Sequence, residues 1–99
     1  MSMRYAFEAD IWVYQGQGAW HFVTVPQALT AGIKVVRGPR SRGWGSLRVQ
    51  AQIGASIWRT SIFPDTGRDA FLLPIKAEVR AREKLSGGER VSVSLEVLI

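Results

Sequence analysis

The chain has 99 residues, 46% hydrophobic and 21% charged, and thirteen Lys and Arg against eight Asp and Glu give a net charge of +5. This length and balance are typical of one globular domain, residues 1–99, which can bury a core without metals or cross-links. No cysteine is present, which excludes disulfides, thiolate metal sites and cysteine nucleophiles. The start carries two acids and no apolar leader, and no stretch approaches the ~20 apolar residues that span a bilayer. We therefore expect a cytoplasmic protein with no membrane contact.

Alternation of apolar and polar residues with a period of two dominates the chain and predicts β-strands. From Tyr5 to Val13 the odd positions are apolar, and an aromatic run over residues 19–25 follows a Gly-rich turn, which predicts a hairpin. Residues 47–53 show the strictest alternation. Further strands are expected over residues 55–63, 70–73 and 91–99, and residues 64–67 have the composition of a type I turn.

Two prolines open the segments that we expect to be helical. Pro26–Ala31 has proline at the favoured first position and should stop at Gly32. Pro74–Lys84 has apolar residues four apart on one face. Six to seven strands with one or two short helices predict a mainly β fold, a small β-barrel, because closure removes exposed strand edges. The apolar faces give the expected core: Phe7, Ile11, Val25, Leu47, Val49, Ile53, Ile57, Leu73, Val79, Val93 and Leu95.

A faint internal repeat accompanies the prolines. Residues 22–29 and 71–79 each have the pattern of a strand, a proline and a short helix, and an alternating strand follows each of them. Two such units could form the pseudo-two-fold halves of one barrel. The alternative is chance similarity, because helices that begin with proline are common.

Several motifs occur in a specific order over nearly the whole chain: WHFVTVPQAL, RGWGSLRVQAQIG, WRTSIFPD and FLLPIKAEVRAREKLSGGERVSVSLEV. This order resembles the bacterial domain-of-unknown-function family 1905, whose pattern has a strand ending in proline, a glycine–aromatic–glycine loop, a TS-x-FP element and an LP-x-K-x-x-VR helix. One departure is the Gly-Gly-Glu of residues 87–89, where the family has glycine followed by aspartate, and Glu89 preserves the charge. The resemblance implies a small β-barrel domain and no particular activity.

The last element is also similar to half of the swapped-hairpin barrel of AbrB-type transcription factors and MazE-type antitoxins. There a strand ends in proline, a short helix carries arginine, and a glycine–acid turn leads into a strand. Here those roles would fall on Leu73-Pro74, Val79-Arg80, Gly88-Glu89 and residues 91–97. Such DNA binders assemble the barrel from two chains, whereas both halves would lie here in one chain, so the usual dimer geometry is missing. Nucleic-acid binding is therefore the alternative function rather than the first.

Positive charge is concentrated in the first two thirds of the chain. No acid occurs from Ile11 to Pro64, and a Gly-rich segment there carries three arginines and a tryptophan. Such a segment suits contact with an anion or a nucleic acid, although it lacks the spacing of phosphate-binding loops. The alternative is a solvated loop whose tryptophan packs against the barrel end. The candidate residues of this basic loop are Arg37, Arg40, Arg42 and Trp44.

The main candidate site combines four polar residues: Arg59, Thr60, Lys76 and Arg80. Only a turn and one short strand separate their two segments, so we expect them to lie together at one end of the barrel, near the basic loop. A mid-strand arginine is costly unless it is paired or reaches solvent. Pairing with Glu78 or Asp65 would make the cluster structural, whereas the absence of such a partner favours an external anion.

The sequence offers little for catalysis. The single histidine, His21, lies between Trp20 and Phe22 in a strand, and no second ligand or triad spacing accompanies it. Glu8 and Asp10 share a strand face, which solvent exposure explains. We predict no catalytic residue, metal or cofactor. We expect a non-enzymatic monomer or weak dimer that binds an anionic small molecule or a protein partner through its arginine-rich end.

Overall fold

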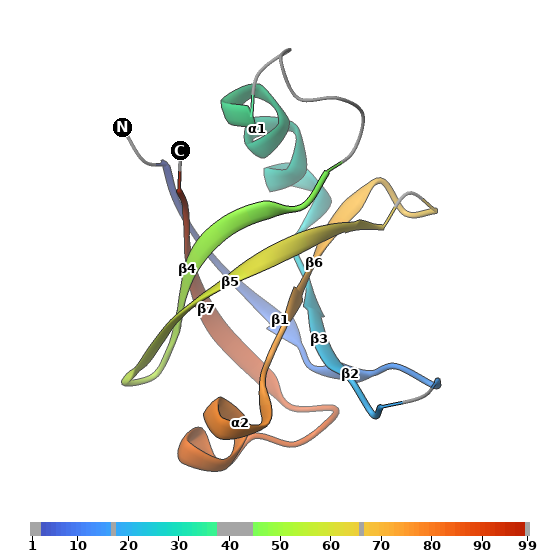
Figure 1. Cartoon of the computed structure of the whole chain (residues 1–99), viewed down its shortest axis with the longest axis vertical. Helices are drawn as coiled ribbons and strands as arrows, with labels where there is room; N and C mark the ends of the chain where they lie inside the picture. Colours follow the sequence, from blue (N-terminus) through green and yellow to red (C-terminus); the bar gives the residue numbers. More distant parts are fainter. Residues whose placement is uncertain (1–2, 17, 38–44, 66, 99) are drawn as a thin grey trace.

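The computed structural model describes residues 3–16, 18–37, 45–65 and 67–98 (Figure 1). In chain order its elements are β1 (Met3–Asp10), β2 (Trp12–Val13), β3 (His21–Thr24), α1 (Gln27–Arg37), β4 (Leu47–Ile53), β5 (Ser56–Asp65), β6 (Ala70–Pro74), α2 (Ala77–Glu83) and β7 (Arg90–Val97). The seven strands lie in the order β1-β7-β4-β5-β6-β3-β2, and every neighbouring pair is antiparallel. The predicted mainly β fold with two short helices is confirmed.

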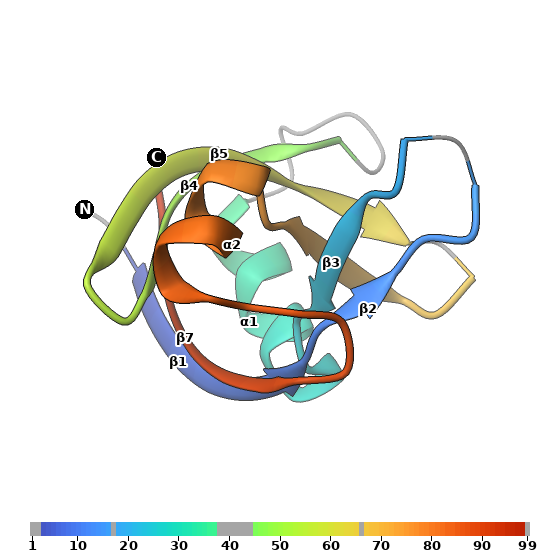
Figure 2. The same ribbon diagram turned by 90° about the horizontal axis from the view of Figure 1, so that it is seen from below.

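The sheet curls round until both of its ends belong to one segment of the chain. β1 pairs with β7 along its whole length, and β2 pairs with β3, yet only Ile11 separates β1 from β2. The backbone N–H of Ile11 donates to the Glu89 carbonyl at 2.8 Å, and its own carbonyl accepts from Gly88 N–H at 2.7 Å. Figure 2 shows the resulting curled wall of strands with α2 in front of it. The first and last strands of the sheet order therefore lie next to each other in space.

The strand pairing has an internal two-fold symmetry. β5 pairs with β4 through its first part and with β6 through its last part, just as the β1–β2 segment pairs with β7 and then with β3. Two backbone hydrogen bonds beside the β3–β6 pair show the same symmetry. Val25 N–H donates to the Phe71 carbonyl at 2.8 Å, and Ile75 N–H donates to the His21 carbonyl at 2.9 Å. The units β3–α1–β4 and β6–α2–β7 are therefore equivalent in their strand pairing, which agrees with the first of the two interpretations of the sequence repeat.

The core fills the space inside the curled sheet. Eight of the eleven expected core residues are buried, and Phe7 and Leu47 pack against them half-buried. Ile57 is the error, because its side chain is 54% exposed. The β4–β5 turn pairs Ile53 with Ser56, and this register directs Ser56 and Trp58 inward and the residue between them outward.

The helices lie at opposite ends of the molecule (Figure 1). α1 runs past Gly32, where we expected it to end, because Ile33 is fully buried and anchors the next turn. A Cβ at Gly32 would lie 3.4 Å from the Tyr5 hydroxyl, so α1 packs against β1 at this position.

α2 is shorter than the expected Pro74–Lys84 segment. Pro74 ends β6, Lys76 has extended backbone at the N-cap, and Lys84 ends the helix in the left-handed conformation. The Ser56 hydroxyl donates to Glu83 Oε2 at 2.6 Å, which ties the end of the helix to β5. Neither helix within the described ranges has the length and apolar character needed to cross a membrane.

Candidate functional site

A hollow of about 320 Å³ opens beside the start of α2, between β3 and β5. We call it the basic pocket, because all four residues of the main candidate site line it: Arg59, Thr60, Lys76 and Arg80. The first two come from β5, Lys76 is the N-cap of α2, and Arg80 lies one turn further along that helix. Its apolar lining includes Trp58 and Ile75, both buried, and the more exposed Trp20.

Arg80 is held in a defined position on the wall of the pocket. Its Nε donates to the Ile75 carbonyl at 3.1 Å, and its Nη1 donates to His21 Nε2 at 3.5 Å. The Nδ1 of His21 lies 2.9 Å from the Ala19 carbonyl oxygen, which can only accept. The neutral ring with its hydrogen on Nδ1 satisfies both contacts. A histidine is therefore part of this pocket as an orienting partner of Arg80, a role for which the sequence carried no local signal.

Arg59 and Lys76 are both exposed at the pocket. Arg59 Nε donates weakly to Gln50 Oε1 at 3.5 Å, across the β4–β5 pair. Of the two arrangements that we considered for a mid-strand arginine, a partner or access to solvent, Arg59 has the second: its side chain is exposed. Its guanidinium and the Lys76 ammonium are therefore accessible to a ligand.

The two acids that we considered as structural partners pair elsewhere. Glu78 Oε1 accepts from Arg82 Nη2 at 2.7 Å, and Asp65 Oδ2 lies 3.8 Å from Arg68 Nε. Within the part of the chain that the structure describes, no ion pair joins a carboxylate to Arg59, Lys76 or Arg80. Cations gathered against apolar walls create a positive potential that attracts anions.

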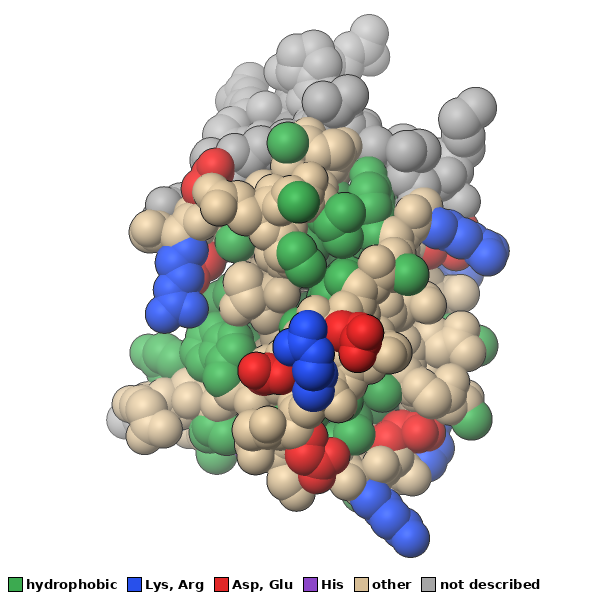
Figure 3. Space-filling model, turned by 180° about the vertical axis from the view of Figure 1, so that it is seen from behind, with side chains coloured by type: hydrophobic (Ala, Val, Ile, Leu, Met, Phe, Trp, Pro, Cys, Tyr) green, Lys and Arg blue, Asp and Glu red, His purple; other side chains and the backbone are tan. Residues whose placement is uncertain are grey.

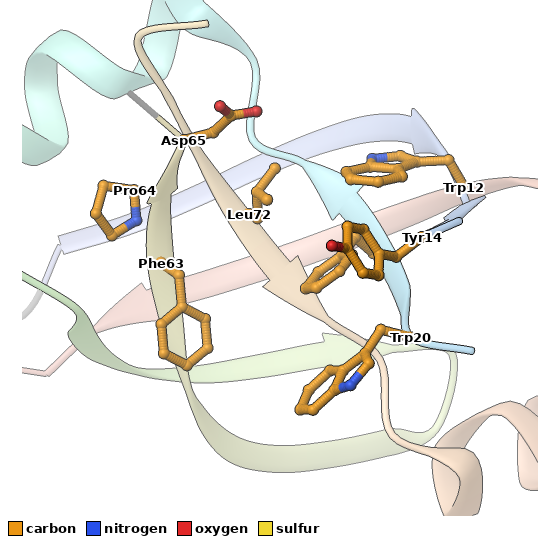
Figure 4. Close-up of a pocket in the computed structure, with 8 residues that line it drawn as sticks. Trp12, Tyr14, Trp20, Phe63, Pro64, Asp65 and Leu72 are labelled. Atoms are coloured by element: carbon orange, nitrogen blue, oxygen red, sulfur yellow. The ribbon is translucent and has the colours of Figure 1, made fainter. Parts of the chain in front are cut away.

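A second hollow of about 560 Å³, the aromatic groove, lies beside the basic pocket. Figure 4 shows Phe63 and Pro64 on one side of it and Trp12, Tyr14 and Trp20 on the other. The Trp12 and Phe22 ring centroids are 5.1 Å apart, and the Trp20 ring stacks on Phe22 at 6.0 Å with an interplanar angle of 10°. The remaining lining residues are Asp65 and Leu72.

We did not predict this groove from the sequence. The available signal was the alternation along the β2–β3 hairpin. Residues two apart on a strand share a face, so Trp12 shares a face with Tyr14, and Trp20 shares a face with Phe22. Alternation shows which residues share a face. It does not show whether the core or a groove covers that face.

The comparison with family models matches residues 7–95 to the domain of unknown function DUF1905. The chain belongs to the DUF1905 family. The match covers every residue that lines the basic pocket and the aromatic groove. No curated protein matches the chain. The resemblance found in the sequence motifs is thus confirmed, and family membership assigns no activity to the domain.

Of the candidate residues in the basic loop of this DUF1905 domain, the structure describes only the backbone of Arg37. Arg37 is the last residue of α1, and the helices lie at opposite ends of the molecule, so the loop begins away from the basic pocket (Figure 1). The Arg37 side chain, Arg40, Arg42 and Trp44 lie outside the described residues.

Other titratable groups of the DUF1905 domain form ion pairs at the surface. Glu8 and Asp10 both face Arg90, at 3.8 Å and 3.2 Å, which is the exposed arrangement that their spacing suggested. Figure 3 shows acidic and basic side chains interspersed over the rear face. Among the described residues, no three His, Asp or Glu side chains cluster as a metal site would require.

Proposed function

We propose that this DUF1905 domain is a non-enzymatic binding module whose basic pocket holds the anionic group of a small molecule or protein partner. The observation that carries the proposal is the convergence of Arg59, Lys76 and Arg80 without a carboxylate partner among the described residues. Isolated surface cations are common, but three that line one hollow are suited to one shared ligand.

The three cations offer complementary chemistry to a phosphate or carboxylate. A guanidinium presents a planar fork of N–H donors that binds such groups bidentately, and an ammonium acts as a compact charge. Arg80 is already oriented by Ile75 and His21, so part of the ordering cost of binding is met before the ligand arrives. The Thr60 side chain adds a hydroxyl to the same lining. The pocket is therefore suited to one anionic group.

Calorimetric titration with inorganic phosphate tests this function. The site variant is Arg59→Gln/Lys76→Gln, and the matched control is Arg4→Gln/Lys84→Gln, which also removes one arginine and one lysine but leaves the pocket lining intact. Both variants lower the net charge by the same amount, so non-specific attraction changes equally. We expect the control to bind like the wild type and the site variant to bind about tenfold more weakly. Equal affinities in the two variants would contradict the proposal.

Short duplex DNA serves as the probe for the alternative, nucleic-acid binding. Binding that neutralises several DNA phosphates weakens steeply as the salt concentration rises. For each neutralised phosphate, a tenfold increase in salt concentration lowers the logarithm of the association constant by about 0.9. A single pocket with three cations predicts only a shallow dependence for inorganic phosphate. Specific duplex binding with a steep salt dependence would favour the nucleic-acid function instead.

A further inference from the structure

The basic pocket and the aromatic groove follow one another along the same strands. β3 contributes His21 to the pocket and Phe22 to the groove, and β5 contributes Thr60 to the pocket and Phe63 to the groove. β6 also contributes to both hollows. Arg59 of the pocket and Phe63 of the groove, both exposed, are four residues apart on the same face of β5, which corresponds to about 13 Å along an extended strand. One small molecule with two chemical parts can therefore reach both hollows.

Trp20 is the one described residue that lines both hollows. Its side chain is 52% exposed, and its ring stacks on Phe22. Tyr14 and Phe63, two further exposed aromatic residues, line the same groove. Single exposed apolar side chains are common, but several that converge in one concave site are typical of a ligand-binding surface.

We propose that the two hollows bind one ligand, a small organic anion that carries a planar ring. The anionic group lies on Arg59, Lys76 and Arg80, and the ring lies against Trp20 in the aromatic groove. This inference rests on the proposed function, because it uses the same cations for the same anionic group. It adds the class of ligand, since an inorganic ion would leave the groove unfilled and a neutral ring would leave the cations without a partner.

The charges around the groove orient such a ligand. Asp65 is the one carboxylate among the described groove-lining residues, which include no Lys, Arg or His, and it pairs with Arg68 at 3.8 Å. The Arg68 guanidinium carbon lies 5.8 Å from the centroid of the Trp12 ring, at the same part of the groove. The Asp65–Arg68 pair has no net charge, so the groove attracts an anion far less than the three cations of the basic pocket do. The ring end of the ligand therefore points toward Asp65 and the anionic end points toward Arg59.

Calorimetric titration with three probes tests the inference: 1-naphthyl phosphate, inorganic phosphate and 1-naphthol. The proteins are wild type, Trp20→Ala, Phe63→Ala and the control Ile57→Ala, which removes an exposed apolar side chain that lines neither hollow. We expect wild type to bind 1-naphthyl phosphate about tenfold more tightly than inorganic phosphate, the gain typical of stacking on an aromatic side chain. Phe63→Ala, at a residue that lines only the groove, should reduce that gain and leave phosphate binding unchanged, which also shows that this variant folds. Trp20→Ala, at the residue that lines both hollows, should also reduce that gain. Ile57→Ala should behave like wild type.

The outcomes separate the inference from the proposed function. If 1-naphthyl phosphate and inorganic phosphate bind wild type equally, the single-ligand inference is overturned and the anion pocket stands. If neither phosphate binds, both proposals fail. If 1-naphthol binds as tightly as 1-naphthyl phosphate, and Arg59→Gln/Lys76→Gln has no effect on the latter, the groove acts alone and the inference is also overturned.

Discussion

The Tyr5 hydroxyl is the buried side-chain polar atom that lacks a hydrogen-bond partner among the described residues. It lies beneath α1 against Gly32. A buried unpaired hydroxyl costs roughly 1–3 kcal/mol. Tyr5→Phe keeps the ring and removes this cost, so we predict that the free energy of unfolding rises by about 1 kcal/mol in urea denaturation. A loss of stability would show that the hydroxyl does make a stabilising contact.

Gly54 has a backbone conformation that other residues adopt only with strain. Its φ is +58°, and an added Cβ would collide with Glu83 Oε1, whose carboxylate is held by Ser56. We predict that Gly54→Ala lowers the free energy of unfolding by about 1–2 kcal/mol. Gly45→Ala is the control, because a Cβ there meets no atom of the described residues within 4 Å and should change stability little. Equal effects of the two substitutions would argue against strain at Gly54.

At the residue scale, the sequence was informative about the cations and uninformative about their surroundings. The closeness of Arg59 to Lys76 and Arg80 follows from short connections along the chain, which can be inferred without a structure. The contact of Arg80 with His21 joins residues far apart in sequence, so no local pattern indicates it. For the same reason, Trp20 was assigned to a strand without any indication that it lines two hollows.

At the element scale, the strands were predictable because each packs one face on the core. The residues on that face are apolar, so apolar and polar residues alternate along the strand. The errors arose where tertiary contacts decide. The alternation from Tyr5 to Val13 shows no break, yet the segment changes partner at Ile11, because its two halves pair with β7 and β3. The exposure of Ile57 depends on the two-residue β4–β5 turn, which fixes the register of β5.

Leu73 and Leu95 test the assignment of the core faces of β6 and β7. Both side chains are fully buried in the core. We predict that Leu73→Ala and Leu95→Ala each lower the free energy of unfolding by about 2–5 kcal/mol in chemical denaturation. Ile57→Ala removes a similar apolar side chain from an exposed position and should cost less than about 0.5 kcal/mol. A cost for Ile57→Ala as large as for the leucines would contradict the register described here.

At the scale of the whole molecule, the fold is symmetric and the chemistry is not. The hydrogen bond from Val25 to Phe71 in one half corresponds to the hydrogen bond from Ile75 to His21 in the other. A residue of the first half therefore corresponds to the residue fifty positions later in the second half. By that relation, Phe71 is the counterpart of His21, and Thr30, which is buried, is the counterpart of Arg80. The histidine–arginine pair joins β3 of one half to α2 of the other, and its symmetric equivalent would be Phe71 with Thr30. The symmetry repeats the strand pairing, and side-chain differences between the two halves supply the basic pocket.

A crystal structure of the domain grown with phosphate tests the anion pocket most directly. We predict an ordered phosphate within hydrogen-bond distance of Arg59 and Arg80, with Lys76 beside it. The phosphate should be lost from crystals of Arg59→Gln/Lys76→Gln grown under the same conditions. Crystals in which the pocket contains only solvent, at phosphate concentrations that saturate binding in solution, would contradict an anion site in the basic pocket.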